Sequence, residues 1–194
     1  PLAPLTTATE LMRRLPADPA LTELRTIIER QLEHLTRLVD DLLDTSRITT
    51  GRIVLRREVV DLRDAVRHSL ETVRPLIESR RHALAVALPD APLCVDADPV
   101  RLAQIFTNLL NNAAKFTPSG GRIELSVEKR EGDAVVTVRD NGIGIAAEVL
   151  PHVFDPRRRV DERHDDAGLG IGLSLVKGLV ELHGGTIAAC SDGA

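Results

Sequence analysis

The first part of the chain carries apolar residues at the spacing of an α-helix. Over residues 21–43 they recur at steps of three, four and seven, which predicts one long amphipathic helix. Apolar positions between residues 5 and 15 suit the end of an earlier helix, and the turn signal of residues 16–19 lets the two helices pack antiparallel. The stripe consists of Leu21, Leu24, Ile28, Leu32, Leu35, Leu38, Val39 and Leu42.

Two antiparallel helices cannot bury such a stripe on both of its flanks. A second copy of the hairpin would complete a four-helix bundle, so we predict a homodimer formed through residues 1–47. The alternative is that the stripe packs on the rest of the same chain, because periodicity alone does not choose a packing partner.

Beyond Gly51 the pattern changes to an irregular mixture of helices and strands. Asp61 is a suitable N-cap for a helix that ends near Ser79, and Pro99 suits the start of a helix that ends near Lys115. The remaining segments are strands at residues 53–55, 83–88, 93–96, 123–127 and 134–138, the last two forming a hairpin, and a helix at residues 174–182.

This mixture lacks a strict βαβ alternation, which favours helices on one face of a mixed, mostly antiparallel sheet. The predicted fold class is therefore α+β. A helical hairpin at residues 1–50 precedes an α/β sandwich at residues 51–194, and a chain of 194 residues accommodates both parts.

Charge and composition exclude several classes of function. Lys and Arg number 25 against 29 Asp and Glu, a net charge of −4, and the basic residues are spread along the chain, so no nucleic-acid partner is predicted. Cys94 and Cys190 form neither a disulfide framework nor a C-x-x-C pair, which fits a cytoplasmic setting. No apolar run approaches the roughly 18 residues that span a bilayer. This segment is not expected to enter a membrane, although a longer parent chain could be anchored in one.

The helix that begins at Pro99 carries a first cluster of polar side chains. Asn108 and Asn112 are four residues apart and Lys115 follows three residues later, so the three project from one stripe. A carboxamide oxygen is a suitable Mg²⁺ ligand, and a lysine adds positive charge for phosphates. The alternative is that these residues form the solvated side of an amphipathic helix.

A second cluster, Asp140-Asn141-Gly142-Ile143-Gly144, follows a predicted strand directly. Its glycines let the backbone approach a flat ligand, and the Asp140 carboxylate can accept a hydrogen bond from an exocyclic amine such as that of adenine. A plain turn is the alternative. A dinucleotide fingerprint is disfavoured, because Pro151 interrupts the helix that it would have to open.

A third cluster is the run Gly168-Leu169-Gly170-Ile171-Gly172-Leu173 at the start of the last helix. Backbone N–H groups at a glycine-rich helix start bind phosphate, although this run is not a Walker sequence. Residues 156–167 are rich in Arg and Asp and nearly free of large apolar groups, so a mobile lid is predicted there.

In this order and spacing, the clusters resemble the catalytic domain of sensor histidine kinases, the two-component family that shares the Bergerat ATP fold with gyrase and MutL. The run QIFTNLLNNAAKFT at residues 104–117 is similar to the N box of that family. Residues 140–144 and 168–172 match its two glycine boxes, and residues 38–51 are similar to the end of its second dimerisation helix.

The resemblance implies an ATP-dependent protein-histidine kinase core. It implies that Asn112 ligates Mg²⁺, that Asn108 and Lys115 lie near the phosphates, that Asp140 binds the adenine amino group and that Arg159 reaches the γ-phosphate. The reaction would pass the γ-phosphoryl group to a histidine of the dimerisation helix, and then to an aspartate of a response-regulator receiver domain. The implied nucleotide-binding set also contains Gly142, Ile143, Gly144, Phe154, Gly168, Leu169, Gly170, Ile171, Gly172 and Leu173.

The chain departs from the family pattern in two respects. None of its 6 histidines lies in the His-Glu-x-x-x-Pro context of the acceptor, which the family places just ahead of a sequence such as Pro1-Leu2. We therefore expect this segment to bind ATP without phosphorylating itself, and we expect the family's last strand to be missing. Arg157 and Arg158 replace an aromatic pair near Phe154, so the alternative function is a nucleotide-sensing or dimerising pseudokinase with an impaired lid.

Overall fold

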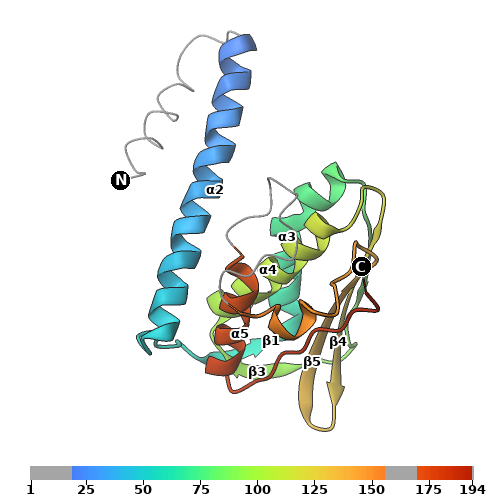
Figure 1. Ribbon diagram of the computed structural model, residues 1–194. Helices are drawn as coiled ribbons and strands as arrows, with labels where there is room; N and C mark the ends of the chain where they lie inside the picture. The colour runs from blue at the N-terminus through green and yellow to red at the C-terminus, as the bar shows by residue number, and fades with distance from the viewer. Residues whose placement is uncertain (1–18, 156–169, 194) are drawn as a thin grey trace.

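The computed structural model describes residues 19–155 and 170–193, and it places one long helix beside an α/β body (Figure 1). None of the described helices combines the length and apolar character that a membrane crossing needs. The elements in chain order are α2 (Pro19–Thr49), β1 (Glu58–Asp61), α3 (Leu62–Ser79), β2 (Ala83–Ala87), β3 (Cys94–Ala97), α4 (Pro99–Phe116), β4 (Arg122–Arg130), β5 (Asp133–Asp140), the 3₁₀ helix η1 (Leu150–His152) and α5 (Gly172–Leu182).

The strands form a mixed sheet with helices on one side, which confirms the predicted α+β class (Figure 1). Strand β4 lies in the middle, parallel to β2 and antiparallel to β5. A tight turn joins β4 to β5, with positive φ angles of 53° at Glu131 and 101° at Gly132, as a hairpin turn with the sheet's own twist requires. Strands β1 and β3 form a separate antiparallel ribbon.

The predicted strand at residues 53–55 is wrong. The strand begins later, because Glu58–Asp61 is the stretch that pairs with Cys94–Ala97. Val54 in the predicted strand is 86% exposed, so a short apolar run did not indicate burial here. Helix α2 extends beyond the predicted residues 21–43, while the expected earlier helix and most of its turn lie outside the described residues.

An aliphatic core joins α3, α4 and α5 to the inner face of β4. Over the first six residues of β4 the buried side chains alternate, at Ile123, Leu125 and Val127, as expected of a sheet with one covered face. Strand β2, by contrast, is exposed along its whole length. The most deeply buried large side chains are Val66, Val73, Leu110, Ile123, Leu125, Leu175, Val176 and Leu179.

The C-terminal half of α2 packs on α4 and α5 through both apolar and charged contacts. A Cβ atom on Gly178 of α5 would lie 2.8 Å from Cγ2 of Ile48, so the glycine permits the close approach of the two helices. Asp44, only 7% exposed, accepts hydrogen bonds from Arg101 Nη1 at 2.5 Å and from Gln104 Nε2 at 3.0 Å. Burial raises the pKa of the neighbouring Asp41 above its usual value.

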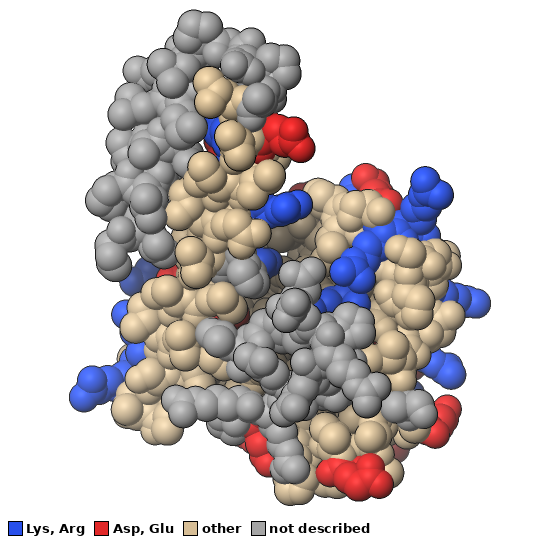
Figure 2. Space-filling view, turned by 45° about the horizontal axis from the view of Figure 1, so that its top comes forward, with Lys and Arg blue, Asp and Glu red and all other residues tan. Residues whose placement is uncertain are grey.

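Along its whole length, α2 leaves much of its apolar stripe uncovered by the part of the chain that the structure describes. Leu32 is buried, but the exposed side chains include Leu21, Leu24, Ile27, Ile28, Leu35, Val39, Leu42 and Leu43. These residues form one helical stripe, so packing on the described α/β body does not account for it. Outside α2, the face shown in Figure 2 carries basic and acidic side chains at several separate places.

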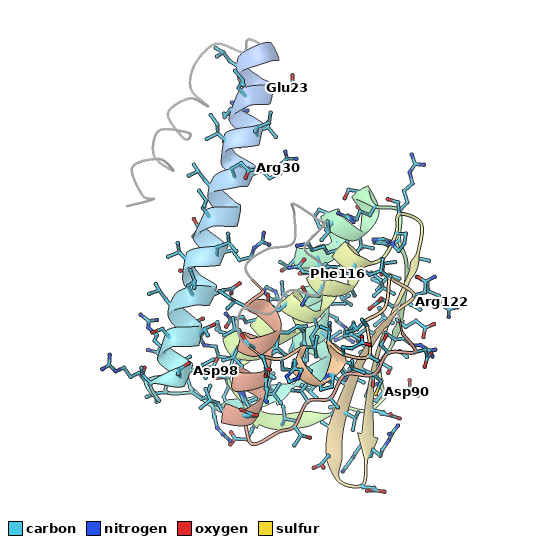
Figure 3. All side chains as sticks on the ribbon, viewed as in Figure 1. Glu23, Arg30, Asp90, Asp98, Phe116 and Arg122 are labelled. Atoms are coloured by element: carbon cyan, nitrogen blue, oxygen red, sulfur yellow. The ribbon has the colours of Figure 1, made fainter. Side chains whose placement is uncertain are left out.

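Asp98 is the N-cap residue of α4 and lies near the C-terminal end of α2 (Figure 3). Its Oδ1 accepts hydrogen bonds from the backbone N–H groups of Val100 and Arg101, and its Oδ2 accepts one from Arg56 N at 2.9 Å. Its own N–H donates to His183 Nε2, which ties the C-terminal end of α5 to the same point. Burial alone would raise the pKa of Asp98, but these N–H donors and the Arg101 charge hold it below the usual 3.8.

Replacing Asp98 by Ala is expected to lower the free energy of unfolding by about 1–2 kcal/mol, because the N-cap acceptor is lost. Since the folded-state pKa is depressed, this contribution is present above pH 3.8 and is lost as the pH falls through the folded-state value. Urea unfolding of wild type and Asp98→Ala at pH 7 and at low pH measures both effects. A difference between the two proteins that stays constant at low pH would contradict the assignment.

The Asp44–Arg101 pair is expected to show a coupling free energy of about 1.5–3 kcal/mol in a double-mutant cycle with alanine at both positions. The pair Asp64–Arg67 on α3 serves as a control, because it joins two exposed side chains at 2.7 Å. Its coupling is expected to stay below about 1 kcal/mol. Equal coupling free energies for the two pairs would contradict the expectation that burial strengthens the Asp44–Arg101 interaction.

Candidate functional site

The predicted N-box side chains lie on the C-terminal half of α4. Asn108, Asn112 and Lys115 are all half-buried, and no described residue hydrogen-bonds the carboxamides of the two asparagines. Asn111 also lacks such a partner, so this feature alone does not mark a site. What separates Asn108 from Asn111 is its neighbour on α5: a Cβ on Gly172 would lie 3.8 Å from Asn108 Oδ1.

The loop after β5 rests on the C-terminal end of α4. Ile143 N donates to Phe116 O at 3.1 Å, and Asn141 forms hydrogen bonds with Arg122 through both its backbone and its side chain. A Cβ on Gly142 would lie 2.5 Å from Phe116 O, so no other residue fits there without a backbone shift. The second cluster and the described part of the third cluster therefore both lie against α4, at two different places.

Asp140 participates in the turn that was the alternative interpretation of its cluster. Its Oδ1 accepts a hydrogen bond from Gly142 N at 2.8 Å. Its Oδ2 accepts none from the described residues, and the side chain is exposed, so one carboxylate oxygen remains available to a ligand. Between this loop and α5, the helical segment in the described part of the chain is the three-residue η1, which contains Pro151.

The start of α5 adopts the backbone that its glycines suggest. Gly170 has a φ of 67°, a left-handed conformation that favours glycine, and α5 begins at Gly172. Ile171 is buried and its carbonyl accepts hydrogen bonds from Ser174 Oγ and Leu175 N. The N-terminal end of α5 lies beside Asn108, because a Cβ on Gly172 would lie 3.8 Å from Asn108 Oδ1.

The described residues contain only part of the predicted site. Arg159, Gly168 and Leu169, together with the predicted lid at residues 156–167, lie outside them. Gly144 has a φ of 72°, Leu173 is half-buried, and Phe154 is half-buried beside the buried Val153. Among the described residues no contact joins Phe154 to Asp140, so the place of Phe154 in the site stays a prediction.

Two residues that the predicted set omitted contact the site. Phe116 supplies the carbonyl that accepts the hydrogen bond of Ile143 N, and its ring centroid lies 5.6 Å from Lys115 Nζ; Figure 3 labels it on α4. Its position directly after Lys115 in the N-box run could have revealed it. Ser191 Oγ accepts a hydrogen bond from Ile145 N at 2.9 Å, and no local sequence signal indicates that contact.

Two family profiles match the chain. The profile described as "Histidine kinase-, DNA gyrase B-, and HSP90-like ATPase" covers residues 97–193, and "His Kinase A (phospho-acceptor) domain" covers residues 1–51. The chain belongs to the sensor histidine kinase family. Histidine protein kinase DivJ of Caulobacter vibrioides is 36% identical to this histidine kinase core over 171 residues. The match covers 88% of this chain and 29% of DivJ, so the chain spans less than a third of that relative.

Solved structures agree with the family. ShkA, solved full-length in complex with AMPPNP, matches this histidine kinase core with a TM-score of 0.73 and 27% identity, over 90% of this chain and 36% of that chain. The histidine kinase AdeS of Acinetobacter baumannii has a TM-score of 0.70 over 97% of this chain and 89% of its own. At 22% identity, AdeS supports the fold alone.

The donor groups of this histidine kinase core fit Mg²⁺ and a nucleotide. Amide oxygens are hard, neutral ligands of the kind that Mg²⁺ accepts alongside waters and phosphate oxygens, and those of Asn108 and Asn112 are not engaged by described residues. The backbone of Phe116 crowds Gly142, and the start of α5 lies beside Asn108. Glycine backbone therefore approaches α4 at two places, near the amide side chains that α4 carries. A glycine-rich helix start of this kind can bind a phosphate group.

Replacing Gly142 by Ala is expected to destabilise this histidine kinase core by about 1–3 kcal/mol, because the new methyl group would overlap the Phe116 carbonyl. Gly172→Ala is the matched control: among the described residues, its methyl group would meet only Asn108 Oδ1, at an ordinary contact distance of 3.8 Å. Its free energy of unfolding should equal or exceed that of the wild type. Thermal or urea unfolding measures both, and a stable Gly142→Ala variant would contradict the crowding.

Proposed function

We propose that this segment binds ATP with Mg²⁺ between α4, the loop at residues 140–144 and the start of α5. The observation that carries the proposal is the meeting of Gly172 with Asn108 Oδ1, because it places a glycine-rich helix start beside an amide oxygen that no described residue engages. A helix N-terminus attracts phosphate through its unpaired N–H groups and its dipole. Membership of a family whose profile is described as an ATPase supports the same substrate.

The side chains of α4 would act on the phosphate end of the nucleotide. In this proposal Asn112 ligates Mg²⁺, with Asn108 and Lys115 close to the phosphates, and Arg159 adds a charge at the γ-phosphate. Bound Mg²⁺ would neutralise charge on the phosphates. Because phosphoryl transfer needs little covalent help from a protein, the work of these residues is to position the phosphate chain and stabilise its charge.

The glycine loop would act on the base. Asp140 Oδ2 accepts the hydrogen bond of the adenine amino group, while Gly142 N holds Oδ1 and so fixes the orientation of the carboxylate. The backbone of Gly142, Ile143 and Gly144 and the ring of Phe154 line the base. The second glycine run, from Gly168 to Leu173, closes the other side over the phosphates.

The reaction we propose is transfer of the γ-phosphoryl group to a histidine of the dimerisation helix, followed by relay to a response-regulator aspartate. The names of the relatives support a histidine kinase, and ThkA has been solved with a response regulator protein. The exposed stripe of α2 supports a homodimer through residues 1–47, with a domain boundary near residue 51. We place this segment in the cytoplasm, where ATP and the regulator are available.

Titration calorimetry with a non-hydrolysable ATP analogue tests the proposal. Wild type should bind the analogue in the presence of Mg²⁺, and Asn112→Ala should bind at least about tenfold more weakly, which corresponds to about 1.4 kcal/mol. Asn111→Ala is the matched control, because the same residue type is removed from a position off the stripe. Its affinity should stay within about twofold of wild type.

The outcomes separate the candidate functions. No binding to the wild type would favour a dimerising scaffold over a kinase, and equal losses in the two asparagine variants would contradict the assigned Mg²⁺ ligand. A longer parent chain incubated with labelled ATP should gain acid-labile, base-stable label, as a phosphohistidine does. Nucleotide binding without any such label in that parent would favour the nucleotide-sensing alternative.

A further inference from the structure

The last turn of α4 has its carbonyls satisfied by residues from several parts of the chain. A helix leaves its last four carbonyls without intrahelical partners. Here Thr117 N donates to Ala113 O and Ile143 N donates to Phe116 O, both at 3.1 Å. The two carbonyls between them, of Ala114 and Lys115, accept hydrogen bonds from side chains instead.

Those side chains belong to the corner between α3 and β2. His82 Nε2 lies 2.9 Å from Ala114 O, and Arg80 Nη1 donates to Lys115 O at 3.1 Å. A carbonyl oxygen only accepts, so His82 Nε2 carries the hydrogen. Ala114 O needs a side-chain donor because the residue four positions on is Pro118, which has no N–H.

The same corner is also joined to the loop that follows α4. Gly120 N donates to Arg80 O at 2.9 Å, and Ala83 N donates to Gly121 O at 2.8 Å. His82 is only 8% exposed, so its hydrogen bond is shielded from water. Helix α3 ends in a Schellman-type motif, in which Arg81 has a positive φ of 55° and His82 N donates to Ile77 O. This motif fixes the backbone that carries Arg80 and His82.

We propose that Arg80 and His82 are positioning residues for the nucleotide site. They act through the backbone of α4, because their hydrogen bonds to Ala114 O and Lys115 O fix the turn that carries Lys115. This inference rests on the proposed function, since it assigns these residues a purpose in nucleotide binding. Neither residue is placed in contact with the nucleotide.

The test compares variants that remove or retain the hydrogen bond of His82. His82→Phe keeps a ring but removes the donor, and the affinity for a Mg²⁺-bound ATP analogue should fall about 3- to 10-fold. His82→Gln places an amide N–H near the original donor and should recover the affinity to within about twofold. Circular dichroism verifies that each variant is folded at the temperature of the titration.

A double-mutant cycle shows whether the effect passes through the last turn of α4. If His82 positions Lys115, the loss caused by His82→Phe should largely disappear in a Lys115→Ala background. An equal fold-loss in both backgrounds would overturn the inference, and so would a His82→Gln variant that binds as weakly as His82→Phe. General destabilisation would produce neither the rescue nor the coupling.

Arg80 supplies a second variant in case His82→Phe does not fold. Arg80→Gln should weaken binding of the analogue about 3- to 10-fold, while Arg74→Gln, which removes an exposed charge from α3, the helix that ends just before Arg80, should leave it unchanged. Wild-type binding with an unaffected Arg80→Gln variant overturns this inference alone. Failure of the wild type to bind overturns the proposed function and this inference with it.

Discussion

Helix α4 is held at both ends by groups from distant parts of the chain, and the candidate site depends on that constraint. At its start, Asp98 accepts hydrogen bonds from the first turn and from Arg56, and its N–H donates to a histidine that follows α5. At its end, the α3–β2 corner and the glycine loop satisfy its last carbonyls. Because the middle of α4 is buried, the helix can neither slide nor rotate without losing these contacts. Side chains at fixed steps along it are therefore presented in a fixed arrangement.

The contact between α2 and the α/β body combines interactions of different character. Ile48 against Gly178 is close apolar packing, whereas Asp44 with Arg101 and Gln104 is a largely buried polar cluster. Burying a charge pair costs desolvation that its attraction only partly offsets, so such a pair contributes less to stability than to orientation. Helix α2 therefore contacts the body through apolar packing on α5 and through a charged cluster on α4.

Local chemistry made much of this structure predictable from the sequence. Asp61, Asp98 and Pro99 mark helix starts through interactions within a few residues, and the hairpin turn at Gly132 is equally local. The glycine boxes were recognisable because a close approach or a positive φ restricts residue choice at that position. Strand β1 was misplaced because its pairing with β3 outweighed the apolar run before it. The contact of Ser191 with Ile145 spans 46 residues and depends on the tertiary fold.

Strand β2 is at the edge of its sheet, and its five residues, Ala-Leu-Ala-Val-Ala, carry no charge. Leu84 and Val86 are exposed, so among the described residues the outer side of β2 presents a row of backbone donors and acceptors flanked by apolar groups. Such an edge is a template for a strand of another molecule. Arg81 and His82 before it and Pro89 after it limit the length of any such intermolecular pairing, much as gatekeeper residues limit self-association in other proteins. The outer edge of β2 is thus a place, separate from α2, where a strand of another molecule can pair.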